Sequence, residues 1–315
     1  MQPTTAILRD IVQKCLSWPL IPRSNTRRSP RRQDNLYGGH HSLPDDIIRR
    51  RRRALTVSSQ NDLRVASQLD CSLLTKLPAE LREQIWRECL AGMTIHLEWK
   101  CTTIPKSRVL SYAPCLSPDP ESCNDFRGEK GCSRFARSLP EIGMPQRHLL
   151  SILLTCRQIY LEAIHLLYEG NTFVATRFYI ALYLPRILLP QRLNSIRSFR
   201  FVWRIVGPPP FAPDKGNNNK ISHFKHNSWN LIWRNLSRMQ RLDKLEVKLV
   251  VWPEFWEDVA ADKMIILLKP VMAVTNPRIF ELTLTHSCRP DESPWKELPC
   301  QIRRVEFADL FQGYM

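Results

Sequence analysis

The chain has 315 residues, of which 43% are hydrophobic and 24% are charged. This composition is typical of a globular protein with a core of its own. Lys and Arg outnumber Asp and Glu by 46 to 30, and the resulting net charge of +16 makes acidic or polyanionic partners worth testing. Only ten glycines occur, and none forms a G-x-G-x-x-G or P-loop pattern, which disfavours a nucleotide-phosphate cradle.

Residues 1–67 form a basic tail that holds +8 of the net charge, from thirteen basic and five acidic side chains. Apolar side chains are scarce over residues 17–67, and we expect that part to be disordered. Apolar residues do recur at helical spacing over residues 5–16, which predicts a short amphipathic helix. A mitochondrial presequence is the less favoured interpretation of this helix, because it contains Asp10 and no clear cleavage signal follows.

The tail also contains a run of arginines that suits a nuclear localisation signal or, equally, a solvated segment. The run consists of Arg49, Arg50, Arg51, Arg52 and Arg53. The sequence shows no secretory signal and no apolar run of eighteen residues. We therefore expect no membrane span, an intracellular protein of the nucleus or the cytoplasm, and reduced cysteines.

We expect a single folded domain over residues 68–315, and its first strong signal is a helix over residues 78–90. Pro78 suits the first helical position, and Glu80 suits the positive end of the helix dipole. Gly92 is expected to end the helix. Apolar residues at three- and four-residue steps predict a stripe that packs on the rest of the domain.

A second amphipathic helix is predicted over residues 149–168, interrupted by polar side chains. Arg157 and Glu162 suit either an ion pair with the first helix or a ligand site, and we favour the ion pair because such residues recur between packed helices. Cys156 and His165 are nine residues apart and face opposite ways, so we interpret Cys156 as a small core residue rather than a nucleophile.

Both predicted helices carry motifs that resemble those of a known family. The Leu-Pro-x-Glu-Leu-Arg motif at residues 77–82 resembles the opening helix of the F-box, which recruits cullin ubiquitin ligases through a Skp-type adaptor. Residues 149–173 resemble the Leu-Leu-x-Thr-Cys-Arg-x-Ile-Tyr-x-Glu-Ala and Leu-Tyr-x-x-Asn-x-Phe hallmark of fungal proteins grouped as a domain of unknown function. The resemblance implies fungal origin, an F-box-like opening and no established catalytic residues. The candidate adaptor-binding residues are Leu77, Pro78, Leu81 and Ile85.

A flexible insert is expected over residues 101–147, after a strand at residues 94–100 that pairs with residues 108–112. Four cysteines in this region are candidate zinc ligands, namely Cys101, Cys115, Cys123 and Cys132. They lack the closely spaced C-x2-4-C pair that structural zinc sites usually present. We therefore expect reduced thiols and no metal.

Beyond residue 173 the sequence predicts alternating strands and helices, with one buried and one wet face on each strand. Parallel strands joined by right-handed crossovers follow from this alternation. The expected fold class is α/β or α+β, with a small curved, mostly parallel sheet, helices on one face, and an irregular leucine-rich-repeat-like arrangement. The strands are expected at residues 199–205, 245–251, 280–284 and 305–307, and the helices at residues 178–193, 221–241 and 254–275.

The helix predicted over residues 221–241 combines tryptophans with arginines, a mixture that also occurs in nucleic-acid-binding proteins. Its apolar residues form one stripe, which is typical of packing on a sheet, and Arg234, Arg238 and Arg241 form a separate solvated row. We therefore do not expect the folded domain to bind nucleic acid.

No paired carboxylates, metal cluster or nucleophile with its base can be placed together, so we expect neither an enzyme nor a cofactor. The sequence favours a non-catalytic protein-interaction or adaptor domain, with F-box-like substrate recruitment to a cullin ubiquitin ligase as its most specific form. The alternative is a basic, nucleus-associated factor whose arginine-rich tail contacts nucleic acid.

Overall fold

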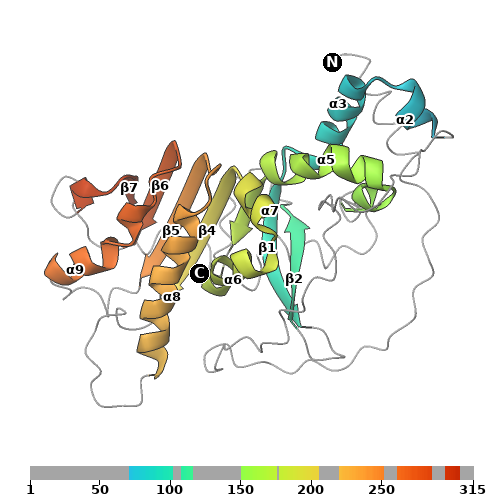
Figure 1. Cartoon of the computed structure of the whole chain (residues 1–315). Coiled ribbons are helices and arrows are strands. Elements are labelled where there is room, and N and C mark those ends of the chain that lie inside the picture. The colour runs from blue at the N-terminus through green and yellow to red at the C-terminus, as the bar shows by residue number, and fades with distance from the viewer. Residues whose placement is uncertain are drawn as a thin grey trace, which may run out of the picture.

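The computed structural model describes residues 71–101, 108–115, 150–175, 177–205, 220–251, 261–285 and 295–305. Within these residues, seven strands form one sheet in the order β2-β1-β3-β4-β5-β6-β7 (Figure 1). They are β1 (Thr94–Cys101), β2 (Arg108–Pro114), β3 (Thr172–Ala175), β4 (Ser198–Ile205), β5 (Lys244–Val251), β6 (Ile279–Leu284) and β7 (Gln301–Arg304). β2 pairs antiparallel with β1, and the other pairs are parallel. The predicted α/β class with a mostly parallel sheet is confirmed.

Helices precede or connect these strands. They are α2 (Ser72–Lys76), α3 (Ala79–Leu90), α5 (Arg157–Glu169), α6 (Phe178–Ile187), α7 (Pro190–Ser195), α8 (Lys220–Ser237) and α9 (Ala261–Leu268), with short 3-10 turns η3 (Ile152–Leu154), η5 (Val271–Ala273) and η6 (Trp295–Glu297). Parallel strands that follow one another in the chain are neighbours from β3 to β7, and right-handed crossovers then place the connecting helices on one face. α6 and α8 lie in front of the sheet in Figure 1.

The core lies between this helical layer and one face of the sheet. Alternate strand residues point into it, and among them Phe199, Phe201 and Trp203 of β4 are buried. Trp229 and Trp233 of α8 are also buried and pack edge to face at 5.4 Å. The tryptophans of α8 therefore serve packing on the sheet, as their helical spacing predicts.

The other face of the sheet is not uniformly wet, which corrects our expectation. Val174, Val202 and Val250 lie there and are buried, and branched apolar side chains at these positions favour exclusion of water. Arg200 is also buried there, and its Nε donates to Glu246 Oε2 of the next strand at 2.6 Å. Because this charge is paired, its burial carries no isolated-ion penalty.

Several predicted boundaries are wrong. The helix predicted from residue 149 begins at Arg157, because Cys156 has an extended backbone (φ −154°, ψ 164°) and separates α5 from η3. Strand β7 ends at Arg304, and Val305, which is the one described residue of the strand predicted over 305–307, is not part of a strand. The sequence also did not predict the five-residue helix α2, the four-residue strand β3 or the 3-10 turn η6.

Other predictions lie outside the described residues. These are the tail over residues 1–67 with its helix at 5–16 and its arginines Arg49–Arg53, most of the insert over residues 101–147, and the side chains of Cys101, Cys123 and Cys132.

Candidate functional site

The two motif-bearing helices, α3 and α5, are joined by an ion pair. Arg82 of α3 donates from Nε to Glu162 Oε2 at 3.0 Å and from Nη2 to Oε1 at 2.9 Å. The planar guanidinium thus binds the carboxylate through both oxygens, the strongest geometry for such a pair. Our prediction that Glu162 pairs with the first helix is confirmed. Arg157, the other candidate, has a buried Nε without a hydrogen-bond partner among the described residues.

Glu162 is the centre of a small polar network. It also accepts hydrogen bonds from Trp86 Nε1 at 3.2 Å and from Gln158 Nε2 at 3.1 Å. Burial would raise the pKa of Glu162, but the hydrogen bonds from Arg82, Gln158 and Trp86 outweigh it and leave this pKa lowered. The same hydrogen bond to Glu162 raises the pKa of Arg82. The network is therefore charged near neutral pH, and its donors and acceptor are paired within the fold.

Arg82 also fixes the corner between α2 and α3. Its Nη1 donates to the carbonyl oxygens of Leu74 at 3.2 Å and Leu77 at 2.6 Å. These carbonyls lie at the C-terminal end of α2, where helical carbonyls lack partners within the helix. One arginine thus orients both helices of the corner, together with Pro78 at the start of α3.

Asn171 ties the ends of α3 and α5 to the sheet. Its Nδ2 donates to the carbonyl oxygens of Leu90 and Leu167, and its Oδ1 accepts from Met93 N at 2.8 Å. The helix ends approach closely here, since a Cβ on Gly170 would lie 2.5 Å from the Cβ of Ala91. Sequence reasoning missed this role, although the Asn in the Leu-Tyr-x-x-Asn-x-Phe motif was its signal.

The four candidate adaptor-binding residues do not share one environment. Ile85 is 7% exposed and belongs to the core, and Leu77 is half-buried against the same core. Pro78 is exposed, and Leu81 is 48% exposed. Only Pro78 and Leu81 therefore present most of their apolar surface to a partner without rearrangement of the domain.

Comparison with protein families identifies the domain that contains these contacts. The family model described as "Domain of unknown function (DUF7730)" matches residues 66–305. The chain belongs to the DUF7730 family. No curated protein and no solved structure matches the chain. Both the Arg82–Glu162 pair and the Asn171 contacts lie inside the matched region.

The described part of this DUF7730 domain contains no group of three or more His, Cys, Asp or Glu side chains that could hold a metal ion. Cys156 lies at the start of α5, where its Sγ accepts a hydrogen bond from Ile159 N at 3.4 Å, a local contact that suits a structural role. Burial raises the pKa of Cys300 to about 12, which keeps that thiol protonated at neutral pH. None of the helices in the described ranges is both long enough and apolar enough to span a membrane.

Proposed function

We propose that this DUF7730 domain is a non-catalytic protein-interaction domain that recruits a Skp-type adaptor in an F-box-like manner, through the exposed side of α3. The observation that supports the proposal is the exposure of the Leu81 side chain. Leu81 keeps 48% of its surface exposed, whereas the other large apolar side chains of α3, namely Ile85, Trp86 and Leu90, are buried; together with the exposed Pro78 it offers an apolar contact for a partner.

The two sides of α3 have different roles in this proposal. Arg82 and Trp86 face α5 and bind Glu162, and Ile85 is buried in the core. Leu81 and Pro78 remain outside these contacts. One apolar stripe therefore does not have to serve both the fold and the partner, because its members are already divided between the two.

The surroundings of Leu81 suit a small interface with a polar rim. Glu80 and Gln84 are exposed beside it, and Glu83 pairs with Arg87 one turn further at 2.7 Å. Burying the remaining exposed surface of Leu81 would contribute about 1 kcal/mol. Hence the leucine would act as one anchor among several contacts, with the fixed α2–α3 corner reducing the entropic cost of binding.

We further propose that the remaining strand–helix units form a curved arc in an irregular leucine-rich-repeat-like arrangement. This arc would bind a second protein partner. Its support is the sequential order of β3 to β7 with helices on one face. Leucine-rich-repeat solenoids also stack successive strand–helix units side by side.

The test is co-purification of the full chain with a Skp-type adaptor. Leu81→Glu places a charge in the centre of the proposed contact and should abolish co-purification. Gln84→Glu adds the same charge on the same helix at the solvated rim, where one exposed charge changes affinity little, and it should retain the adaptor. Circular dichroism checks that both variants fold. Retention of the adaptor by Leu81→Glu, or failure of the folded wild-type chain to bind adaptor at micromolar concentration, would refute the F-box-like role.

A further inference from the structure

The positive charge of the domain is concentrated in its middle. Residues 177–251 contain fourteen Lys and Arg against three Asp and Glu, which is +11 of the net +16. Residues 68–176 are neutral by the same count, and residues 252–315 carry −3. The excess therefore lies on the segment from α6 to β5, separate from the basic tail.

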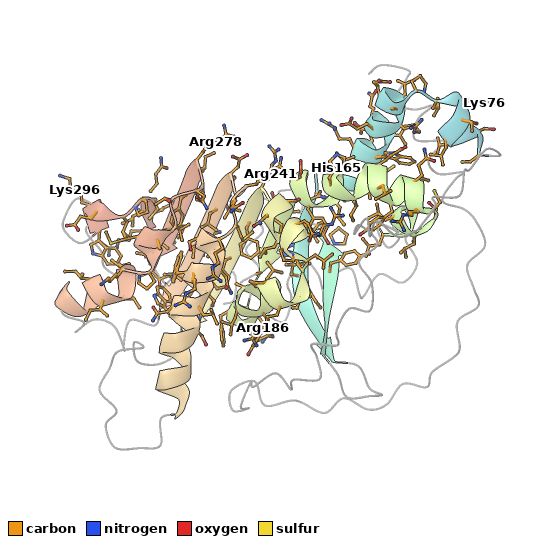
Figure 2. The ribbon with its side chains drawn as sticks, in the orientation of Figure 1. Lys76, His165, Arg186, Arg241, Arg278 and Lys296 are labelled. Atoms are coloured by element: carbon orange, nitrogen blue, oxygen red, sulfur yellow. The ribbon has the colours of Figure 1, made fainter. Side chains whose placement is uncertain are left out.

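Four exposed arginines come from the C-terminal end of α8, the turn after it and the loop held against that end, and we call them the arginine cluster: Arg234, Arg238, Arg241 and Arg278. The first three follow one another along the last turn of α8 and the turn after it. The loop before β6 is held against this turn, since Asn276 Nδ2 donates to Ser237 O at 2.9 Å. In Figure 2, Arg241 and Arg278 point outward from the end of the sheet at which β5 and β6 begin.

Carboxylates within the domain neutralise only part of this cluster. Glu169 pairs with Arg241 at 2.8 Å, and Asp243 pairs with Arg278 at 3.1 Å. Both acids also face Arg197, at 3.6 and 3.8 Å. No carboxylate of the described residues pairs with Arg234 or Arg238, so a net positive surface remains.

The helix dipole explains only some of these cations. Basic side chains at the C-terminal end of a helix are stabilised within its last turn, which applies to Arg234. Arg278 comes from a separate loop, and its side chain is 81% exposed. A structural role at the end of α8 therefore does not account for the cluster as a whole.

We infer that the arginine cluster binds an acidic segment of a partner protein. Guanidinium groups bind carboxylates through two parallel hydrogen bonds, and the pairs with Glu169 and Asp243 show that the cluster already holds carboxylates. Single-stranded nucleic acid would instead call for exposed rings on which bases stack. None of the aromatic side chains that the structure describes is exposed. This second surface does not depend on adaptor binding at Leu81.

The experiment measures fluorescence anisotropy of a labelled decaglutamate peptide with the full chain, in which Arg49–Arg53 are replaced by Gln to remove five of the thirteen basic side chains of the tail. Arg234→Glu with Arg238→Glu should weaken binding about tenfold, and added salt should weaken binding to the parent. Arg177→Glu with Arg186→Glu makes the same charge change at the two ends of α6, where both arginines are exposed, and should change affinity less than about twofold.

Two results would overturn the inference. Equal weakening by both double variants would show that the peptide responds to net charge alone. Tighter binding of a thymidine oligonucleotide of equal charge, lost in the Arg234→Glu and Arg238→Glu variant, would assign the cluster to nucleic acid. Circular dichroism of each variant separates loss of binding from loss of fold. Adaptor capture through Leu81 should be unchanged in all of them, so the two proposals succeed or fail separately.

Discussion

Arg82 and Glu162 are eighty residues apart in the chain and are joined by two hydrogen bonds of 3.0 and 2.9 Å. Arg82 closes the Leu-Pro-x-Glu-Leu-Arg motif, and Glu162 belongs to the second motif. The two motifs that characterise the sequence are thus halves of one contact. They hold α3 on α5 and, through the carbonyls of Leu74 and Leu77, fix α2 beside them.

The first prediction concerns the strength of this pair. Arg82→Met should lower the free energy of unfolding by about 3 kcal/mol, because it leaves Glu162 partly buried without its main partner. Arg87→Met is the matched control on the same helix, since its pair with Glu83 is solvent-exposed and should cost less than about 0.5 kcal/mol. Urea denaturation measures both. Equal losses would show that the Arg82–Glu162 contact is no more important than a surface pair.

The second prediction concerns pH. The pKa of Glu162 is lower in the folded chain than its ordinary value. The contribution of Glu162 to the free energy of unfolding is therefore complete above the unfolded pKa of about 4.3, and it is lost as pH falls through the lower folded pKa. Unfolding free energies between neutral pH and about pH 3 should therefore decrease with acid. Glu162→Gln should show a smaller decrease, with the remainder due to carboxylates such as Glu246, whose pKa is also lowered. An identical decrease in the variant would contradict the lowered pKa of Glu162.

The third prediction tests the contact between the helix ends and the sheet. Asn171→Ala removes hydrogen bonds to Leu90, Leu167 and Met93 from a buried site and should cost about 3 kcal/mol. Asn276→Ala removes one exposed hydrogen bond to Ser237 and should cost less than about 1 kcal/mol. Thermal unfolding of the two variants gives the comparison. A mild effect of Asn171→Ala would mean that water or neighbouring groups replace its hydrogen bonds.

The fourth prediction uses two neighbouring leucines in η3. Leu153 is 3% exposed, whereas Leu154 is 74% exposed. Leu153→Ala should cost about 2 to 5 kcal/mol because it leaves a cavity, and Leu154→Ala should stay within about 0.5 kcal/mol of the parent. Denaturant unfolding of the two variants gives the comparison, and the midpoint of Leu153→Ala should be the lower one. A reversed order would mean that Leu154, and not Leu153, is the buried leucine of η3.

Periodic patterns predicted the parts of the fold in which one face of an element is buried. The stripe on residues 78–90 and the alternation along β4 and β5 both correspond to observed elements. Short elements were not predicted, because α2 and β3 contain too few residues to show a periodic pattern. The break in the predicted helix at Cys156 was not predicted either, because the helical spacing of apolar residues continues through Cys156 although its backbone is extended.

The candidate site was predictable only in part. The pairing of Glu162 with the first helix followed from a charged residue within an apolar stripe. The identity of the partner of Glu162 could not be predicted, because the first helix contains more than one arginine and only the folded geometry selects Arg82. For the same reason, the sequence could not separate Leu81 from Ile85, which share a helical stripe but differ in burial.

The most direct test of the proposed interaction is amide hydrogen exchange of the full chain, alone and with a Skp-type adaptor. Amides in the first turn of a helix lack intrahelical acceptors and exchange readily, so those of Glu80 and Leu81 report on the start of α3. We predict slower exchange of the amides of residues 79–84 in the complex, with β5 and β6 unchanged. A complex that leaves the amides of residues 79–84 unprotected, or that protects only another part of the domain, would contradict the proposed interaction.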